Sequence, residues 1–202
     1  MEPVVLPTID YTSLLSFDIG INNLAFCELA VPKDTPSNIV RTRIIKWEII
    51  SLREPKEKID FDEMMKRLLV QLRTRWPQGS QLPDRVLLEN QPCMKNPTMK
   101  SIQVFIYAYF AMVSMPGLLT PQLFSASNKL KVKRNTLLKT GQKQKTVSYG
   151  EKKKMAIAVT RLYVSDDWLT FFEKQKKKDD YSDCYLQAVY YVENSWKMWF
   201  SQ

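Results

Sequence analysis

The stretch Leu14–Gly20, with the sequence LLSFDIG, decides the fold, because it has the form of a buried strand with one charged residue, Asp18, near its end. Arg85–Asn90, with the sequence RVLLEN, repeats this form and places Glu89 at the end of a second hydrophobic strand. A charge at the edge of a core strand is costly unless another group compensates it. A divalent cation shared by several carboxylates is one such compensation, and it also makes chemistry possible. The two stretches therefore predict a metal site that includes Asp18 and Glu89.

The N-terminal part of the chain predicts an antiparallel meander followed by a helix. Residues 14–19, 24–31 and 44–50 have the pattern of three strands with short polar links, and the first link contains a tight turn. From residue 59 the apolar residues recur at helical spacing as far as Trp76, and Asp60 is a suitable N-cap.

The rest of the chain predicts a strand, a helix, a short strand and three further helices. Their expected bounds are 85–90, 96–112, 122–125, 151–164, 167–175 and 180–196. This order is that of the ribonuclease H-like fold, an α/β fold with a five-stranded mixed sheet flanked by helices, and we expect it to form one domain over residues 1–202. In that layout the first strand is central and the Glu89 strand lies beside it. A late helix crosses the same end of the sheet.

Composition limits the chemistry that the chain can perform. It has 202 residues, of which 45% are hydrophobic, and no apolar run of the length of a membrane span. We expect no signal or transit peptide, no membrane partner, no small-molecule cofactor, and three reduced cysteines. The chain contains no histidine, which excludes Ser–His triads, Cys–His zinc sites and a histidine general base. Acid–base work must use carboxylates, lysines or metal-bound water.

Positive charge is concentrated between residues 127 and 154. This segment holds ten basic residues and one acid, so it accounts for the whole net charge of +9. Such a concentration indicates a polyanionic partner, above all nucleic acid. Few large apolar groups occur in 127–150, which predicts a flexible basic loop there. The residues expected to contact DNA are Lys129, Lys131, Lys133, Arg134, Lys143, Lys145, Lys152 and Lys154.

Asp180 and Asp183 form an acidic pair at the start of the last expected helix. A spacing of three places both carboxylates on one face, where they repel unless a cation lies between them. With Asp18 and Glu89 they would form an all-oxygen site suited to Mg²⁺ or Mn²⁺. Two such ions can activate a water and stabilise the leaving oxygen in phosphodiester cleavage.

Three blocks of the sequence resemble the Holliday junction resolvases of the RuvC superfamily. They are Ser16–Ala25 (SFDIGINNLA), Leu88–Pro92 (LENQP) and Lys177–Asp183 (KKDDYSD). The resemblance extends from about Leu14 to Val192, and it is greatest to the branch found in poxviruses and other large DNA viruses, with fungal mitochondrial resolvases as relatives.

The resemblance implies a homodimeric, Mg²⁺-dependent endonuclease that cuts four-way DNA junctions by paired symmetric nicks during viral DNA recombination and replication. It implies two Mg²⁺ ions per site, replaceable by Mn²⁺, with Asp18, Glu89, Asp180 and Asp183 as ligands. It also implies a catalytic lysine on the helix before the acidic pair, where Lys153 matches best and Lys152 and Lys154 adjoin it. A viral protein of this kind would act in the cytoplasm of the infected cell, or alternatively in the nucleus.

Other interpretations remain open from the sequence. An Asp-x-x-Asp pair is common at helix starts, and three consecutive lysines often form a solvated helix face. A nuclease of the same fold could act on other branched DNA or on an RNA–DNA hybrid, and a non-catalytic DNA-binding module would also explain the basic segment. An actin-like sugar kinase or ATPase is disfavoured, because the five glycines form no second phosphate loop after Glu89.

Overall fold

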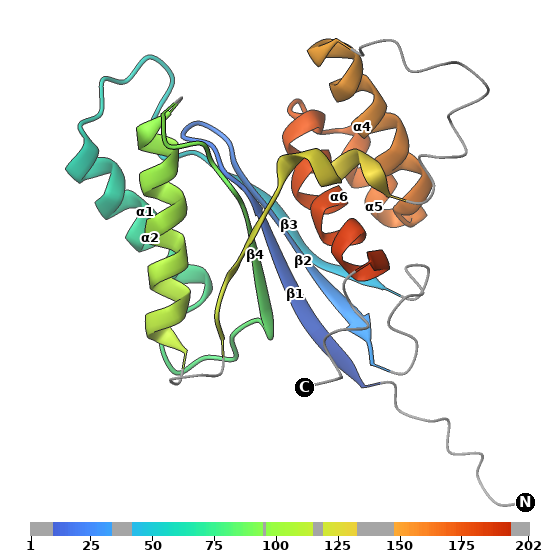
Figure 1. The fold of residues 1–202 in the computed structure, drawn as a ribbon, viewed down its shortest axis with the longest axis horizontal. Coiled ribbons are helices and arrows are strands. Elements are labelled where there is room, and N and C mark those ends of the chain that lie inside the picture. The colour runs from blue at the N-terminus through green and yellow to red at the C-terminus, as the bar shows by residue number, and fades with distance from the viewer. Residues whose placement is uncertain (1–9, 34–41, 95, 115–118, 133–147, 195–202) are drawn as a thin grey trace, which may run out of the picture.

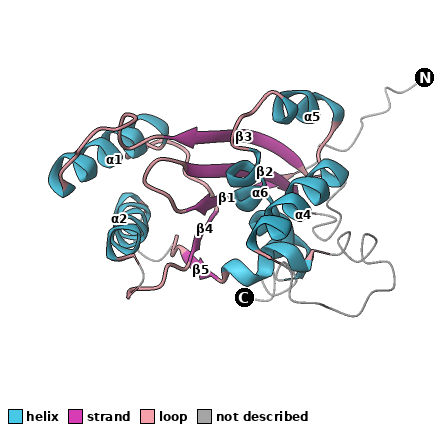
Figure 2. Ribbon diagram, turned by 90° about the horizontal axis from the view of Figure 1, so that it is seen from above, coloured by secondary structure: helices cyan, strands magenta, loops and turns pink. Residues whose placement is uncertain are grey.

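The computed structural model describes residues 10–33, 42–94, 96–114, 119–132 and 148–194, and these ranges form a sheet with helices on both faces (Figures 1 and 2). The strands are β1 (Tyr11–Asp18), β2 (Leu24–Pro32), β3 (Arg43–Ile50), β4 (Arg85–Glu89) and β5 (Gln122–Phe124). The sheet has five strands in the order β3-β2-β1-β4-β5. β1 pairs antiparallel with β2 and parallel with β4, which itself pairs parallel with β5. This confirms the predicted α/β fold with a five-stranded mixed sheet and a central first strand.

β1 begins three residues earlier than the sequence pattern predicts. Tyr11, Thr12 and Ser13 are not strongly apolar, yet their backbones pair with the end of β2, from Pro32 back to Ala30. The pairing partner extends this strand, because hydrogen bonds of the ladder do not depend on an apolar side chain.

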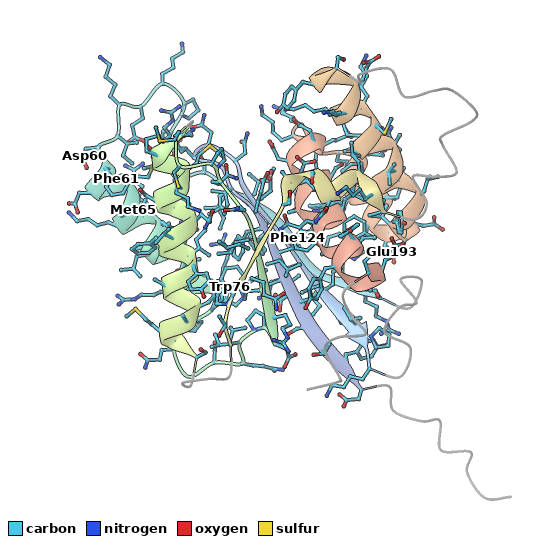
Figure 3. The ribbon with its side chains drawn as sticks, in the orientation of Figure 1. Asp60, Phe61, Met65, Trp76, Phe124 and Glu193 are labelled. Atoms are coloured by element: carbon cyan, nitrogen blue, oxygen red, sulfur yellow. The ribbon has the colours of Figure 1, made fainter. Side chains whose placement is uncertain are left out.

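One face of the sheet is covered by α1 (Phe61–Arg75) and α2 (Pro97–Val113). Asp60 lies at the start of α1 (Figure 3). It caps the helix as predicted, since its carboxylate accepts a hydrogen bond from the backbone N–H of Glu63 at 2.8 Å. Trp76 follows α1 and packs edge-on against Phe26 of β2 and Phe110 of α2, with ring centroids 5.0 and 5.5 Å apart. These buried aromatic rings join both helices to the sheet.

The other face is covered by α4 (Tyr149–Tyr163), α5 (Asp166–Glu173) and α6 (Lys178–Asn194). Each begins one or two residues before its predicted start. α6 is buried along most of its length and packs against β1, β2 and α4. Trp47 of β3 lies at the centre of the aromatic cluster on this face and stacks on Phe172 of α5, with ring centroids 5.3 Å apart.

The start of the basic segment differs from the predicted loop. Residues Ala126–Lys131 form a short 3-10 helix, η2, directly after β5, and Ser125 caps it. η2 packs against α6 and α4, which holds it on the sheet. Residues 133–147, to which most of the predicted loop belongs, lie outside the described residues.

In the part of the chain that the structure describes, no helix combines the length and apolar character needed to cross a bilayer.

Candidate active site

Acidic side chains from three elements meet at one edge of the sheet. Asp18 is the last residue of β1 and Glu89 is the last residue of β4, and the parallel pairing of these strands places both ends at the same edge. Asp180 and Asp183 lie in the first turns of α6, which crosses that edge. All four side chains line one pocket of about 850 Å³. The convergence that the sequence pattern predicts is therefore present.

A buried lysine lies among these carboxylates. The ammonium nitrogen of Lys129, on η2, is 2.7 Å from an Asp18 oxygen, 3.1 Å from Asp183 and 3.2 Å from Glu89. The Lys129 side chain is 7% exposed, so these charges interact largely out of contact with water. Lys129 is thus the cation that compensates the three acids in this structure.

Two hydrogen-bonding side chains fix α6 against the sheet near the acids. The indole N–H of Trp47 donates to the backbone carbonyl of Tyr181, between the two aspartates of α6, at 3.0 Å. The side-chain amide of Gln187 donates to the Ser16 hydroxyl and the Phe17 carbonyl at 3.0 and 3.2 Å. Because Ser16 and Phe17 immediately precede Asp18, these bonds set the position of α6 relative to the end of β1.

Burial is the main cause of the raised pKa values of three of these acids. Burial raises the pKa of Asp18, Lys129 lowers it in part, and Glu89 raises it further, so that it reaches about 8. Burial also raises the pKa of Asp180 to about 6, helped by Asp179 and Asp18, and raises the pKa of Asp183. Burial alone would lower the pKa of Lys129, but the surrounding carboxylates reverse this effect and raise it.

The donor set fits a hard divalent cation, although the carboxylates are not arranged around an ion here. Within the described ranges, no three acidic, cysteine or histidine side chains are grouped as a metal-binding cluster. Instead, oxygens of Asp18, Glu89 and Asp183 surround a single ammonium nitrogen. Carboxylate oxygens that gather around one cation are suited to Mg²⁺ or Mn²⁺ in its place. Asp180 lines the pocket and would complete the set.

Lys153 faces the same pocket from α4 but is held by a different acid. Its ammonium nitrogen lies 2.5 Å from an Asp179 oxygen and 5.1 Å from the centre of the Tyr149 ring. Hydrogen bonding to Asp179 raises the pKa of Lys153 beyond the cost of its partial burial. It is therefore a fixed positive charge on the pocket wall.

The remaining basic residues fall into three groups. Lys152 is exposed and lines the pocket. Lys131 and Lys154 are exposed outside the pocket lining, and the ammonium of Lys131 donates to the Asn128 side chain at 2.9 Å. Four predicted DNA contacts lie outside the described residues: Lys133, Arg134, Lys143 and Lys145.

Sequence reasoning did not predict that Lys129 is buried among the acids or that Arg53 lines the pocket. It also did not predict that Asp179 pairs with Lys153. Lys129 was expected to be an exposed phosphate contact in a loop, but it is buried among the acids. The position of Lys129 follows from the parallel pairing of β5 with β4, because this pairing directs the residues after β5 to the same edge of the sheet as Glu89. Arg53 lines the pocket from the segment after β3, where no cluster of basic residues marks it.

Solved structures that resemble this chain include Holliday junction resolvases. The fowlpox virus resolvase, crystallised with Holliday junction DNA, has a TM-score of 0.61 and 20% identity, with 91% of this chain and 99% of that chain covered. The yeast mitochondrial Holliday junction resolvase has a TM-score of 0.59 and 16% identity, covering 93% and 82%. Thermus thermophilus RuvC has a TM-score of 0.51 and 14% identity, covering 91% and 97%. The chain therefore has the RuvC-like variant of the ribonuclease H-like fold.

One sequence relative comes from a virus. An uncharacterized protein of Acanthamoeba polyphaga mimivirus is 34% identical over 123 residues. The match covers 54% of this chain and 29% of that protein, so the chain spans less than a third of the relative's length. No protein-family model matches the chain.

Proposed function

We propose that this protein is a Mg²⁺-dependent DNA endonuclease that resolves four-way junctions by paired symmetric nicks, in viral DNA recombination and replication. The observation that carries the proposal is the convergence of Asp18, Glu89 and Asp183 on one point of a pocket that Asp180 also lines. The fold shared with the fowlpox and yeast resolvases supports junction DNA as the substrate. The mimivirus relative supports a viral role.

The acidic residues have the role of metal ligands in this proposal. Asp18, Glu89, Asp180 and Asp183 would hold Mg²⁺, which when bound activates water and stabilises the leaving oxygen of the cleaved phosphodiester. Burial raises the pKa values of Asp18, Asp180 and Asp183, and a bound cation would stabilise these buried carboxylates in their charged form. The hydrogen bonds that fix α6 to β1 hold the ligands of separate elements at one place.

Two lysines supply positive charge to the proposed site. Lys129 holds the carboxylates together in this structure, and it lines the same pocket, where it remains available as a cation once the metal has displaced it. Lys153 adds a second cation, which Asp179 and Tyr149 hold in place on the pocket wall. A fixed cation near the scissile phosphate stabilises the negative charge that develops during cleavage. Lys129 therefore joins Lys153 as a candidate catalytic lysine.

A homodimer is part of the proposal, because paired nicks in a two-fold junction require two equivalent sites. α2 carries exposed apolar side chains that a second copy could cover, with Val104 51% and Met112 79% exposed. Light scattering coupled to size exclusion tests this: we expect the mass of two chains, and a monomer that still makes paired nicks would contradict it.

The substrate is tested by incubating the protein with end-labelled four-way junction, linear duplex and RNA–DNA hybrid in Mg²⁺ or in EDTA. We expect Mg²⁺-dependent nicks at symmetric positions on two junction strands, and neither other substrate cut at a comparable rate. Faster cleavage of the hybrid would replace the junction by a different substrate of the same fold. Binding of DNA without cleavage would favour a non-catalytic module.

Asp180→Asn separates metal chemistry from DNA binding. The substitution removes a ligand charge while retaining the size of a side chain that is partly buried at the pocket. We expect cutting to be abolished and junction affinity in EDTA to stay near the wild-type value. Cutting by this variant at the wild-type rate would show that Asp180 is not a ligand.

A further inference from the structure

We infer that Arg53 and Asn22 form a phosphate-binding site for the DNA strand on the pocket wall opposite α4. The inference rests on the proposed function and extends it, since the basic segment at 127–154 was the expected source of DNA contacts. Arg53 and Asn22 line the same pocket as the acids, but they belong to the segment after β3 and to the turn between β1 and β2. The basic groups of α4 come from the other face of the sheet.

The turn that carries Asn22 is tightly built. A Cβ atom placed on Gly20 would lie 2.5 Å from the Asn23 carbonyl oxygen, so a residue without a side chain is needed there. The turn starts directly after Asp18, and its Ile21 carbonyl accepts a hydrogen bond from the Leu52 N–H at 3.1 Å. The backbone of the Arg53 segment is therefore joined to the turn.

Both the backbone and the side chain of Arg53 are held in place by neighbouring residues. The preceding residue, Leu52, is fully buried in the core on the α1 and α2 side. The Ser51 hydroxyl donates to the Arg53 carbonyl, and the Arg53 Nε–H donates to the Asn22 side-chain oxygen, both at 2.5 Å. The hydrogen bond from Nε orients the guanidinium and leaves its two terminal NH₂ groups as donors. A guanidinium oriented in this way can bind a phosphate through two parallel hydrogen bonds.

Two arginines of α1 form ion pairs, whereas Arg53 acts on Glu57 through a longer-range charge interaction. Arg67 is paired with Glu57 and Glu63, and Arg75 is paired with Glu48. Among the described residues, no carboxylate lies within ion-pair distance of the Arg53 guanidinium. A cation that lines an acid-lined pocket, with its terminal donors unpaired by a carboxylate, is suited to bind a phosphodiester backbone placed between it and α4.

Basic side chains of α4 supply positive charge on the other wall of the pocket. Lys152 and Lys153 line it there, and the acids of β1, β4 and α6 lie between the two sides. A DNA strand that follows both sides would place one of its phosphates over the acids. This arrangement explains how a pocket with several buried carboxylates admits a polyanion.

The test compares Arg53→Ala, Arg53→Lys and Arg73→Ala in the full chain. Arg73 is the matched control, because it is exposed in the last turn of α1 and does not line the pocket. Junction affinity is measured in EDTA by fluorescence anisotropy at several salt concentrations. Loss of one phosphate contact in Arg53→Ala is expected to weaken binding about tenfold and to reduce the slope of log affinity against log salt by about 0.9. Arg53→Lys keeps the slope with a smaller loss of affinity, and Arg73→Ala matches the wild type.

Asn22→Ala completes a double-mutant cycle. If Asn22 acts by orienting the guanidinium, its loss of affinity disappears when Arg53 is already alanine. Single-turnover cleavage in Mg²⁺, with enzyme in excess of junction, should show the Arg53→Ala defect at enzyme concentrations below the Kd and recover at saturating enzyme, as expected for a binding residue.

The outcomes separate this inference from the proposed function. Junction cleavage by the wild type, with Arg53→Ala indistinguishable from Arg73→Ala, overturns the phosphate site and leaves the nuclease intact. DNA binding by the wild type without cleavage overturns the nuclease, while the salt slope of Arg53→Ala still decides the phosphate site. Absence of any DNA binding overturns both.

Discussion

Lys129→Met is the substitution whose effect on stability follows most directly from the structure. It removes an almost fully buried ammonium that contacts three carboxylates at 2.7 to 3.2 Å. Removing one partner of a buried ion pair typically costs about 3–5 kcal/mol, because a buried charge is left uncompensated. Asp18, whose pKa is already about 8, can take up a proton and relieve part of this cost. We therefore expect a loss near the lower limit, about 3 kcal/mol at pH 8 in EDTA.

Thermal unfolding followed by circular dichroism measures this loss. For a domain of this size, about 3 kcal/mol corresponds to a decrease in Tm of about 6–12 °C. Millimolar Mg²⁺ should restore a larger part of the stability in Lys129→Met than in the wild type, since the carboxylates then have a different cation available.

Lys131→Met is the matched control, because Lys131 lies on the same short helix and is exposed. Its effect should stay within about 0.5 kcal/mol, the usual range for a surface substitution. Equal melting of the two variants in EDTA would refute the view that Lys129 compensates the acids. Equal rescue of both variants by Mg²⁺ would refute the view that the metal takes over that role.

Three further changes test the surroundings of the site. Burial raises the pKa of Glu28 above its ordinary value of 4.5, so its contribution to stability should fall as pH rises from about that value toward the folded pKa. Asp18, Asp180 and Asp183 contribute in the same direction, so Glu28→Gln should make the fall smaller in denaturant titrations across pH, and an unchanged profile would exclude Glu28 as a source. Gly20→Ala places a Cβ 2.5 Å from the Asn23 carbonyl oxygen, so we expect destabilisation by about 1–3 kcal/mol and slower cleavage. Wild-type stability and a wild-type cleavage rate would show that the turn adapts. Gln187→Leu removes two buried hydrogen bonds to β1 and should raise the Mg²⁺ concentration needed for half-maximal cleavage, and an unchanged Mg²⁺ dependence would show that α6 is positioned without it.

The sheet and its covering helices could be predicted because their sequence patterns are strong. The strands that end at Asp18 and Glu89 each contain a mainly hydrophobic stretch before the acid, and α1 has a clear apolar face with Asp60 as its cap. Parallel pairing then brings the two strand ends to one edge, so the grouping of the acids follows from strand order.

The role of Lys129 could not be read from local sequence. A six-residue 3-10 helix has too few turns to give a periodic pattern, and Lys129 stands in a segment rich in other lysines. Its burial arises from the packing of η2 against α6, which is a tertiary contact. Net charge indicates an anionic partner, but it does not distinguish a lysine that contacts DNA from one that compensates buried acids.

Arg53 was missed because it has no basic neighbours, whereas Lys129 was missed because it has many. It is isolated in sequence, with Glu54 beside it, so no local excess of positive charge marks it. The hydrogen bond from Leu52 to Ile21 brings its segment to the turn after Asp18, and this contact joins positions about thirty residues apart in the chain. Functional residues that depend on such contacts become visible in the folded structure.

The central claim is that the carboxylates at the end of β1, β4 and α6 bind the divalent cation used for cleavage. Anomalous diffraction from crystals soaked in Mn²⁺, at a concentration that supports junction cutting, tests it most directly. We expect Mn²⁺ peaks within bonding distance of Asp18, Glu89 and Asp183, with the Lys129 ammonium displaced from its present position. Cleavage-competent Mn²⁺ without a peak at these oxygens, and with Lys129 still in contact with all three carboxylates, would contradict the claim.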